Sequence, residues 1–251
     1  MPRIQPRQSK PRRNTAKAEF RPTASTSALA VAARPAGAAR KPRLAAVTAE
    51  PRKSIRAENE KAILAAAEHV FAEHGFRGAT TAEIAARAGI PKANLHYYFP
   101  TKAALYRRVI QRVLEMWMAA AAVLDRSDDP AIALAGYIGT KMDLARAEPL
   151  GSKIWASEIM RGAPVIQDFL ETTLRDWVAT REVIFKRWIA SGKLRPIEPR
   201  NLLSMIWAST QHYADFSHQI AVLNDGRPLT DAQFETAKQQ VISMILRGTL
   251  A

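Results

Sequence analysis

The stretch GFRGATTAEIAARAGIPKANLHYYFPTKAALYRRV, residues 75–109, carries the local signals that decide the fold. Thr80 or Thr81 is a natural N-cap, because a threonine hydroxyl accepts a hydrogen bond from a free N–H in the first helical turn. Gly89 ends that helix after about two turns. Pro91 can begin a second short helix, since a first-turn proline loses no needed N–H. Two short helices joined by a tight turn predict a helix-turn-helix, whose second helix enters the DNA major groove.

The side chains of this stretch suit a polyanionic partner. Six basic residues stand against one acidic residue, Glu83, and such an excess of positive charge attracts DNA phosphates. We expect the second helix to present polar groups to the groove while the helix ends hold phosphates. The alternative is an ordinary helical hairpin with a solvated basic face. The predicted DNA-contacting residues are Thr80, Thr81, Lys92, Ala93, Asn94, His96, Tyr97 and Lys102.

Apolar residues in and before the stretch predict how its helices pack. Residues 55–74 form an amphipathic pattern at helical spacing, which indicates a first helix packed on the other two. The apolar residues expected inside this three-helix unit are Ile63, Ala67, Val70, Phe71, Ile84, Ala85, Ala88, Ile90, Leu95 and Phe99.

The stretch resembles the DNA-binding signature of the TetR family of bacterial transcriptional regulators. The family often has tyrosine where this chain has His96, and an imidazole can also donate to a phosphate. The resemblance implies a homodimer that binds a palindromic DNA operator and responds to a small effector. It is carried by Thr80-Thr81, Ile84-Ala85, Ala88-Gly89, Tyr97-Tyr98-Phe99, Pro100, Thr101-Lys102 and Leu105-Tyr106.

The first 53 residues differ from the rest in charge and composition. They hold 13 of the 37 Lys and Arg residues, only 2 of the 23 Asp and Glu residues, and 7 of the 15 prolines. Such a segment buries too little apolar surface to offset its ordering entropy, so we expect a disordered tail. A basic arm that adds nonspecific DNA affinity and an over-long translation start are equally compatible with it. A transit peptide shares the composition but does not suit a bacterial-type regulator.

Composition also narrows the class of protein. The 251 residues are 47% hydrophobic, which is enough for a packed core, and include no cysteine, as expected in a reducing cytoplasm. No apolar run reaches the length of a membrane span. We therefore expect a cytoplasmic, nucleoid-associated protein with no membrane partner, no metal and no cofactor.

After the head the helix signals continue to the end of the chain, with Pro and Gly between them. The pattern predicts an all-α protein: a helix-turn-helix head over residues 54–101 and a helical body for ligand binding and dimerisation over residues 102–251. From the second short helix of the head to the end of the chain, the expected helices are 92–99, 102–124, 131–147, 152–161, 165–190, 200–222 and 230–247.

One body segment, RNLLSMIWASTQHYADFS at residues 200–217, is rich in polar and aromatic side chains. A helix face of this kind can supply a flat wall and directed hydrogen-bonding groups for a small polar ligand. The alternative is that the aromatic side chains belong to the core, that the polar groups are satisfied there and that the helix forms a dimer face. For Trp117, Trp155 and Glu158, each taken by itself, a core role is favoured. The candidate ligand-binding residues are Trp117, Trp155, Glu158, Trp207, Gln211, His212 and Tyr213.

Further segments sharpen the resemblance over residues 55–247. They are similar to a branch of the family whose members are repressors that bind uracil or thymine, which implies a pyrimidine effector. A different small polar effector is the alternative. The segments are Gly162-Ala163-Pro164, SGKLRPIEP at 191–199 and MIWASTQHYADF at 205–216.

Two other classes of function fit the sequence less well. His212, Asp215 and Glu158 could serve as acid–base groups of an enzyme, but no nucleophile elbow, phosphate-binding glycine loop or metal-ligand spacing accompanies them. A nonspecific architectural DNA-binding protein would explain the basic tail but not the polar aromatic helix. A thermal-shift screen with nucleobases would separate the three classes: a regulator gains stability with one effector, an architectural protein with none, and an enzyme consumes what it binds.

Overall fold

The computed structural model describes the backbone of residues 50–251 and the side chains from Ile55 onward, so the predicted basic tail lies almost entirely outside it. The predicted all-α class is confirmed. Residues 50–251 form helices and no β-strand, apart from one isolated bridge between Leu194 and Leu250. No helix among these residues is long and apolar enough to cross a membrane.

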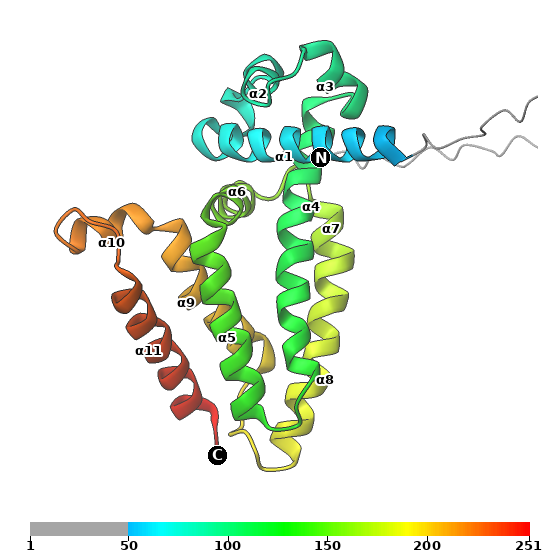
Figure 1. The fold of residues 1–251 in the computed structure, drawn as a ribbon. Helices are drawn as coiled ribbons and strands as arrows, with labels where there is room; N and C mark the ends of the chain where they lie inside the picture. The colour runs from blue at the N-terminus through cyan, green and yellow to red at the C-terminus, as the bar shows by residue number, and fades with distance from the viewer. Residues whose placement is uncertain (1–49) are drawn as a thin grey trace, which may run out of the picture. The chain divides into compact units, whose positions relative to one another are not determined.

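The head consists of α1 (Glu50–Gly78), α2 (Thr81–Arg87) and α3 (Lys92–Tyr98), which lie at one end of α4 (Lys102–Ala120) (Figure 1). The local signals act as predicted. The Thr80 hydroxyl caps α2 by accepting from the Glu83 backbone N–H at 3.1 Å. Gly89 then adopts a positive φ of 69°, which costs glycine little.

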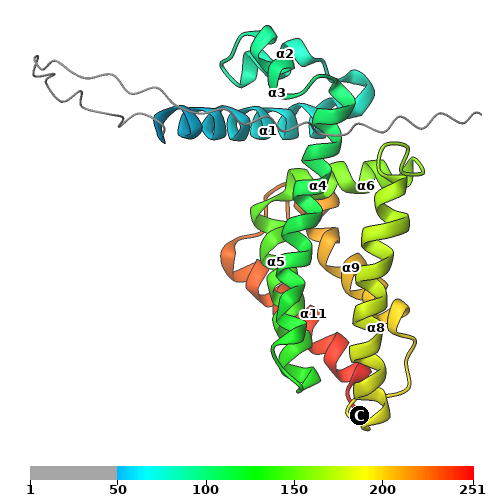
Figure 2. The ribbon, with the colours of Figure 1, turned by 90° about the vertical axis from the view of Figure 1, so that its right-hand side faces the viewer.

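The body continues from α4, which runs between α5 and α8 (Figure 1 and Figure 2). Helices α5, α9 and α11 pack against one another, and α6 contacts α1, α4 and α9. Its elements are η1 (Ala121–Asp125), α5 (Pro130–Ala147), α6 (Pro149–Met160), α7 (Gln167–Phe169), η2 (Leu170–Leu174), α8 (Arg175–Ala190), α9 (Pro199–Asp215), α10 (Ser217–Leu223) and α11 (Asp231–Thr249).

Two hydrophobic cores hold the described part of the chain together. The head core contains the predicted stripe of α1 and the predicted residues of α2 and α3, with Ala88 and Ile90 packed at its border. It also includes Ile154 of α6 and Ala163 and Ile166 of the following loop, so head and body share one core. The second core lies among α5, α8, α9 and α11.

The predicted helix 165–190 begins two residues late, at Gln167, and is not a regular α-helix throughout. The Glu158 side chain accepts a hydrogen bond from the Val165 backbone N–H at 2.7 Å, and regular helix begins only at Gln167. A π-helical turn, η2, then precedes α8. The late start of the helix reflects this contact with Glu158 of α6, and the sequence of residues 165–190 contains no signal that predicts it.

The predicted helix 200–222 is interrupted. Phe216 leaves helical geometry, with φ −110° and ψ 27°, and separates α9 from α10. Its ring stacks on His212 at 4.9 Å between centroids. No glycine or proline marks this break. The predicted helix 102–124 instead tightens into the 3₁₀ turn η1 after Ala120.

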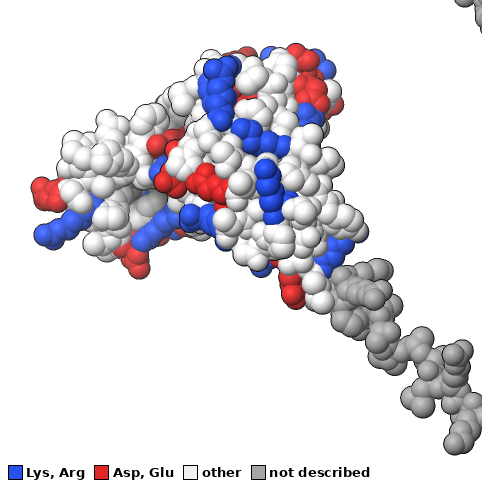
Figure 3. Space-filling view, turned by 90° about the horizontal axis from the view of Figure 1, so that it is seen from above, with Lys and Arg blue, Asp and Glu red and all other residues white. Residues whose placement is uncertain are grey.

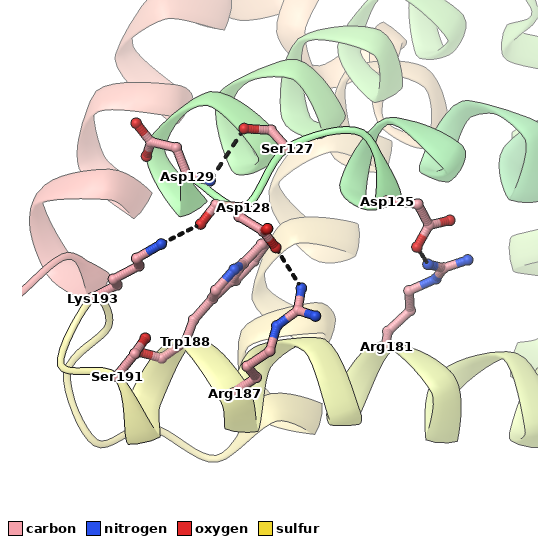
Figure 4. Close-up of polar contacts among 9 residues, drawn as sticks. All are labelled: Asp125, Ser127, Asp128, Asp129, Arg181, Arg187, Trp188, Ser191 and Lys193. Carbon is pink, nitrogen blue, oxygen red and sulfur yellow. Dashed lines mark hydrogen bonds and ion pairs between the residues drawn. The ribbon is translucent and has the colours of Figure 1, made fainter.

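Ion pairs close the body at the end opposite the head (Figure 4). Asp128 lies between η1 and α5 and binds Arg187 of α8 at 2.7 Å, while its carbonyl oxygen accepts from Lys193 at 2.8 Å. Arg181 pairs with Asp125. These contacts tie the η1–α5 connection to α8 and so fix α4 and α8 relative to each other.

Candidate nucleic-acid interface and effector cavity

Helix α3 divides its residues between the core and the surface. Leu95 is fully buried, whereas Tyr97 is 72% exposed. Anchored through Leu95, the seven-residue helix keeps a polar face available for a partner. All five residues predicted to meet the groove are exposed on it: Lys92, Ala93, Asn94, His96 and Tyr97.

The three residues predicted to hold phosphates lie at helix starts. Thr80 is exposed and caps α2 through its oxygen, which leaves the hydroxyl hydrogen free to donate. Thr81 is half-buried beside it. The Lys102 ammonium donates to the carbonyl oxygens of Arg77 at 3.4 Å and Ala79 at 2.8 Å. Lys102 therefore ties α4 to the end of α1, and its phosphate contact stays a prediction.

The positive charge of the head is distributed differently from the sequence expectation. Arg107 donates to Asp168 at 2.9 Å and to the Val165 carbonyl, and Arg108 pairs with Glu115. Arg107 therefore ties α4 to the segment before α8, and Arg108 pairs within α4, so both guanidinium groups are engaged by body residues. Their partners lie seven or more positions away, so local sequence did not reveal the pairing.

Arg56 in α1 is a candidate DNA contact that the sequence analysis missed. Its guanidinium lies 5.8 Å from the centre of the exposed Tyr97 ring, so it adds a positive charge beside the polar face of α3. Asn59, one turn later, donates to the Tyr98 hydroxyl at 3.3 Å and fixes α1 against α3. Viewed from above, the molecule carries Lys and Arg side chains across its surface, with Asp and Glu side chains next to some of them (Figure 3).

Buried polar contacts join the head to α6. Glu158 of α6 is fully buried and accepts from the Tyr106 hydroxyl of α4 at 3.2 Å. Burial, and secondarily the Glu158 carboxylate, raise the pKa of Tyr106, so the phenol stays protonated as a donor. Glu68 of α1 accepts from the backbone of Gly151, near the start of α6, and burial raises its pKa. A Cβ at Gly151 would lie 2.6 Å from Val113, so close packing requires glycine there.

Four of the five tryptophans of the chain line one cavity of about 50 Å³ inside the body. Its walls come from five helices and the π-helical turn, and most of them are apolar or aromatic. The lining residues are Leu114, Trp117 and Met118 of α4, Tyr137 and Lys141 of α5, Trp155 of α6, Leu174 of η2, Trp177 of α8, and Trp207 and Gln211 of α9.

The aromatic walls of the cavity are fixed by mutual contacts. Trp117 and Trp155 meet edge to face at 5.6 Å, and Trp177 lies 6.2 Å from Trp207. The Trp207 indole N–H donates to the Tyr137 hydroxyl at 2.9 Å. Burial raises the pKa of Tyr137 to about 12, so this hydroxyl keeps a hydrogen that it can donate in turn.

Two polar groups of the cavity remain without a partner among the described residues. The Gln211 carboxamide makes no hydrogen bond to any of them, although it offers both a donor and an acceptor. The Lys141 ammonium lies 4.2 Å from the centre of the Trp117 ring and makes no ion pair or hydrogen bond within residues 55–251. Both groups are therefore available to a molecule in the cavity.

The structure brings together four of the seven candidate ligand-binding residues: Trp117, Trp155, Trp207 and Gln211. Three do not line the cavity. Glu158 binds Tyr106 and the Val165 N–H, as described above. His212 is exposed and stacks on Phe216, because it projects from the other side of α9. Tyr213 packs edge to face on Phe234 of α11 and lines a separate surface hollow with Arg146.

Tyr137, Lys141 and Trp177 are the polar and aromatic lining residues that the sequence analysis missed. Tyr137 and Lys141 are four positions apart, so they share one face of α5, and a buried lysine on an apolar helix is an uncommon feature. The four-residue spacing of Tyr137 and Lys141 was the sequence signal that could have identified them as lining residues. Trp177 had no distinguishing signal, because Phe185 and Trp188 share its side of α8 and belong to the core.

A helix-turn-helix head joined to a helical body with an internal cavity is the architecture of a one-component regulator of transcription. Residues 63–109 match the family of bacterial regulatory proteins called the tetR family, and residues 110–251 match the C-terminal region of YcdC-like proteins. The chain belongs to the TetR family of transcriptional regulators.

Individual relatives agree with this assignment. The chain is 37% identical over 189 residues to the HTH-type transcriptional regulator RutR of Escherichia coli (strain K12), a match that covers 75% of this chain and 89% of RutR. It is 24% identical to the HTH-type transcriptional repressor KstR2 of Mycolicibacterium smegmatis over 194 residues, covering 74% of this chain and 88% of KstR2. These relatives are transcriptional regulators rather than enzymes.

Solved structures share the fold. The ketosteroid transcriptional regulator KstR2 of Mycobacterium tuberculosis superposes with a TM-score of 0.63 at 20% identity, covering 76% of this chain and 95% of that one. AibR, solved with isovaleryl coenzyme A and operator DNA, superposes with a TM-score of 0.60 at 18% identity, covering 74% and 97%. At these identities the likeness concerns the fold alone.

Proposed function

We propose that this TetR-family regulator represses transcription by binding a palindromic operator as a homodimer, and that a pyrimidine such as uracil or thymine releases it. The observation that carries the proposal is the tryptophan-lined cavity, in which the Gln211 carboxamide has no hydrogen-bond partner among the described residues. The similarity to RutR, at 37% identity, supports the regulatory part. The pyrimidine rests on the chemistry of the cavity and on the resemblance of residues 205–216.

The homodimer is supported by apolar side chains left exposed on the last helices of the body. Met205 of α9 is 63% exposed, Leu223 of α10 is 80% exposed and Met244 of α11 is 72% exposed. A two-fold interface would cover the same patch on both subunits. Each head would then read one half-site of the operator.

A pyrimidine ring matches the groups of the cavity. It has two flat faces, which indole walls can cover, and an edge of carbonyl acceptors and N–H donors. Gln211, one turn after Trp207 on the same face of α9, can both donate to and accept from such an edge. The Tyr137 hydroxyl and the Lys141 ammonium add donors for the carbonyl oxygens.

The size of the cavity provides a mechanism for the response. A cavity of roughly 150 Å³ accommodates benzene, so a pyrimidine needs more room than the 50 Å³ present here. Binding would push Trp117 of α4 and Trp155 of α6 apart. Glu158, three residues after Trp155, holds Tyr106 near the head end of α4. Movement of α4 and α6 would therefore change how the head is held and weaken operator binding.

The test combines ligand binding with operator release. Calorimetry and tryptophan fluorescence should detect uracil or thymine binding to the wild-type protein, and the same ligand should release operator DNA in a gel shift. Gln211→Ala should keep DNA binding but respond to ligand at least about tenfold more weakly, since a buried edge hydrogen bond contributes roughly 0.5–1.5 kcal/mol and an unpaired partner costs more.

Gln219→Ala provides the matched control, because Gln219 is exposed on α10 and does not line the cavity. It should respond like the wild type. Absence of heat and of thermal stabilisation with either pyrimidine at millimolar concentration would exclude the pyrimidine and leave the cavity to another small polar molecule.

A further inference from the structure

Lys141 is a buried lysine that the fold itself does not explain. It lies near the middle of α5, only 3% exposed, and its side chain forms part of the cavity wall. Lysine is almost never buried to this extent unless it is paired, because an ammonium loses its hydration on burial. The position therefore calls for a compensating interaction.

The described residues compensate the charge only in part. The ring of Trp117, 4.2 Å from the ammonium, provides a cation–π contact. Asp215 of α9 attracts it electrostatically but is not within ion-pair distance, and its carboxylate accepts from Ser152 of α6 at 2.6 Å. The N–H donors of the ammonium make no hydrogen bond to the described residues, and the side chain lines the cavity.

The charged and titratable groups around Lys141 can be named helix by helix. Tyr137 lies one turn earlier on α5, and Asp215 and the exposed His212 lie on α9. Burial raises the pKa of Asp215, and the positive charge of Lys153 on α6 opposes this rise. Arg181 of α8 forms an ion pair with Asp125, and its positive charge opposes the rise that burial causes in the pKa of Tyr137. The segment of α4 that lines the cavity contributes Leu114, Trp117 and Met118, which do not titrate.

Burial lowers the pKa of Lys141 to about 7, although Asp215 opposes the change. Near neutral pH the amine is thus close to the midpoint of its titration, and an acceptor placed against it would shift it to the charged form. A ligand that carries negative charge would gain most, because hydrogen bonds between charged groups are the stronger ones.

We propose that Lys141 selects the effector: its ammonium binds an acceptor oxygen on the ring edge, and the cavity prefers planar heterocycles whose acceptor is anionic over neutral ones. This inference rests on the proposed function, since it concerns the same cavity. It adds a chemical class, an acidic pyrimidine such as a ring-ionised trione or a ring carboxylate, and it couples ligand binding to protonation of the protein.

The experiment is calorimetry with uracil and with barbiturate, whose ring is ionised at neutral pH, between pH 6 and pH 8.5. The wild type should bind barbiturate more tightly than uracil at pH 6.5 by about tenfold or more. The affinity for both should fall above pH 7, approaching tenfold per pH unit. Proton uptake on binding should show as an observed enthalpy that varies with the ionisation enthalpy of the buffer.

Lys141→Met keeps the length of the side chain and removes its charge. It should bind barbiturate at least about tenfold more weakly, lose the preference for it and show a flat pH profile. Lys153→Met is the matched control, because it removes a lysine that also faces Asp215 but does not line the cavity. It should retain both the preference and the pH dependence.

Thermal melting gives a readout that needs no ligand. The pKa of Lys141 falls on folding from 10.5 to about 7, so between these values the unfolded chain binds more protons and wild-type stability rises with pH. Lys141→Met should therefore melt above the wild type at pH 6, and the difference should shrink as pH rises from 7 towards 10. A constant difference would show that the lysine does not titrate in this range.

The outcomes separate the two proposals. Uracil binding that is independent of pH and unchanged in Lys141→Met would overturn the role of Lys141 while the pyrimidine cavity stood. Failure of both rings to bind the wild type would overturn the cavity assignment and the inference together. If Lys141→Met does not fold, the ligand preference and pH profile of the wild type decide the matter alone.

Discussion

The head and the body of this regulator present their candidate sites in opposite ways. In the head, a buried anchor, Leu95, holds a helix whose polar face is already exposed, and the residues that would meet DNA are neighbours in the sequence. In the body, the candidate site is an internal cavity assembled from five helices and the turn η2, between Leu114 and Gln211. A DNA-binding surface of this kind needs one helix held in the right orientation, whereas the effector cavity needs the whole helical bundle to be packed.

The comparison predicts that substitutions in α3 fall into two distinct groups. Leu95→Ala should destabilise the protein by about 2–5 kcal/mol, because it removes a fully buried side chain from the core that α1, α2 and α3 share. Urea denaturation followed by circular dichroism measures this. A loss below about 1 kcal/mol would mean that the head does not depend on its core in this way.

The connection between the two regions can be broken at Glu158. Glu158→Ala leaves the buried Tyr106 hydroxyl and the Val165 N–H without their acceptor, so we expect a loss of about 1–3 kcal/mol in the free energy of unfolding. Because the contact joins α4 to α6, operator release by ligand should weaken as well. Glu115→Ala, an exposed carboxylate of α4 paired with Arg108, should change stability little. Equal effects of the two substitutions would contradict the role of Glu158.

The smallest effect on folding is expected on the exposed face of α3. Lys92→Ala and Tyr97→Ala should leave the melting temperature within a degree or two of the wild type, because both side chains are exposed. Both should weaken operator binding, and loss of one phosphate contact at Lys92 should flatten the salt dependence by about one unit. Gel shifts at several salt concentrations test this. Unchanged affinity in both variants would remove α3 from the role of DNA reader.

Much of the head could be read from local sequence, because its signals act over three or four residues. The hydroxyl of Thr80 caps α2, and Thr101 caps α4 by accepting from the Ala104 N–H at 3.0 Å. The tight turn after α2 needs a residue with positive φ, and Gly89 adopts this conformation at little cost. Helical spacing likewise placed Leu95 and the α1 stripe on the buried side, since the 3.6-residue repeat fixes which residues share a face.

The sequence by itself determined the all-α class, the head and the aromatic face of α9, because capping, helix-breaking and periodicity are properties of short segments. Only the tertiary structure decided which polar residues face the cavity. It placed Lys141 inside and Tyr213 outside, since each position depends on how α4, α5, α6, α8 and α9 pack. The acceptor role of Glu158 also arises from a contact between separate elements, and such a contact leaves no pattern in the chain on either side of it.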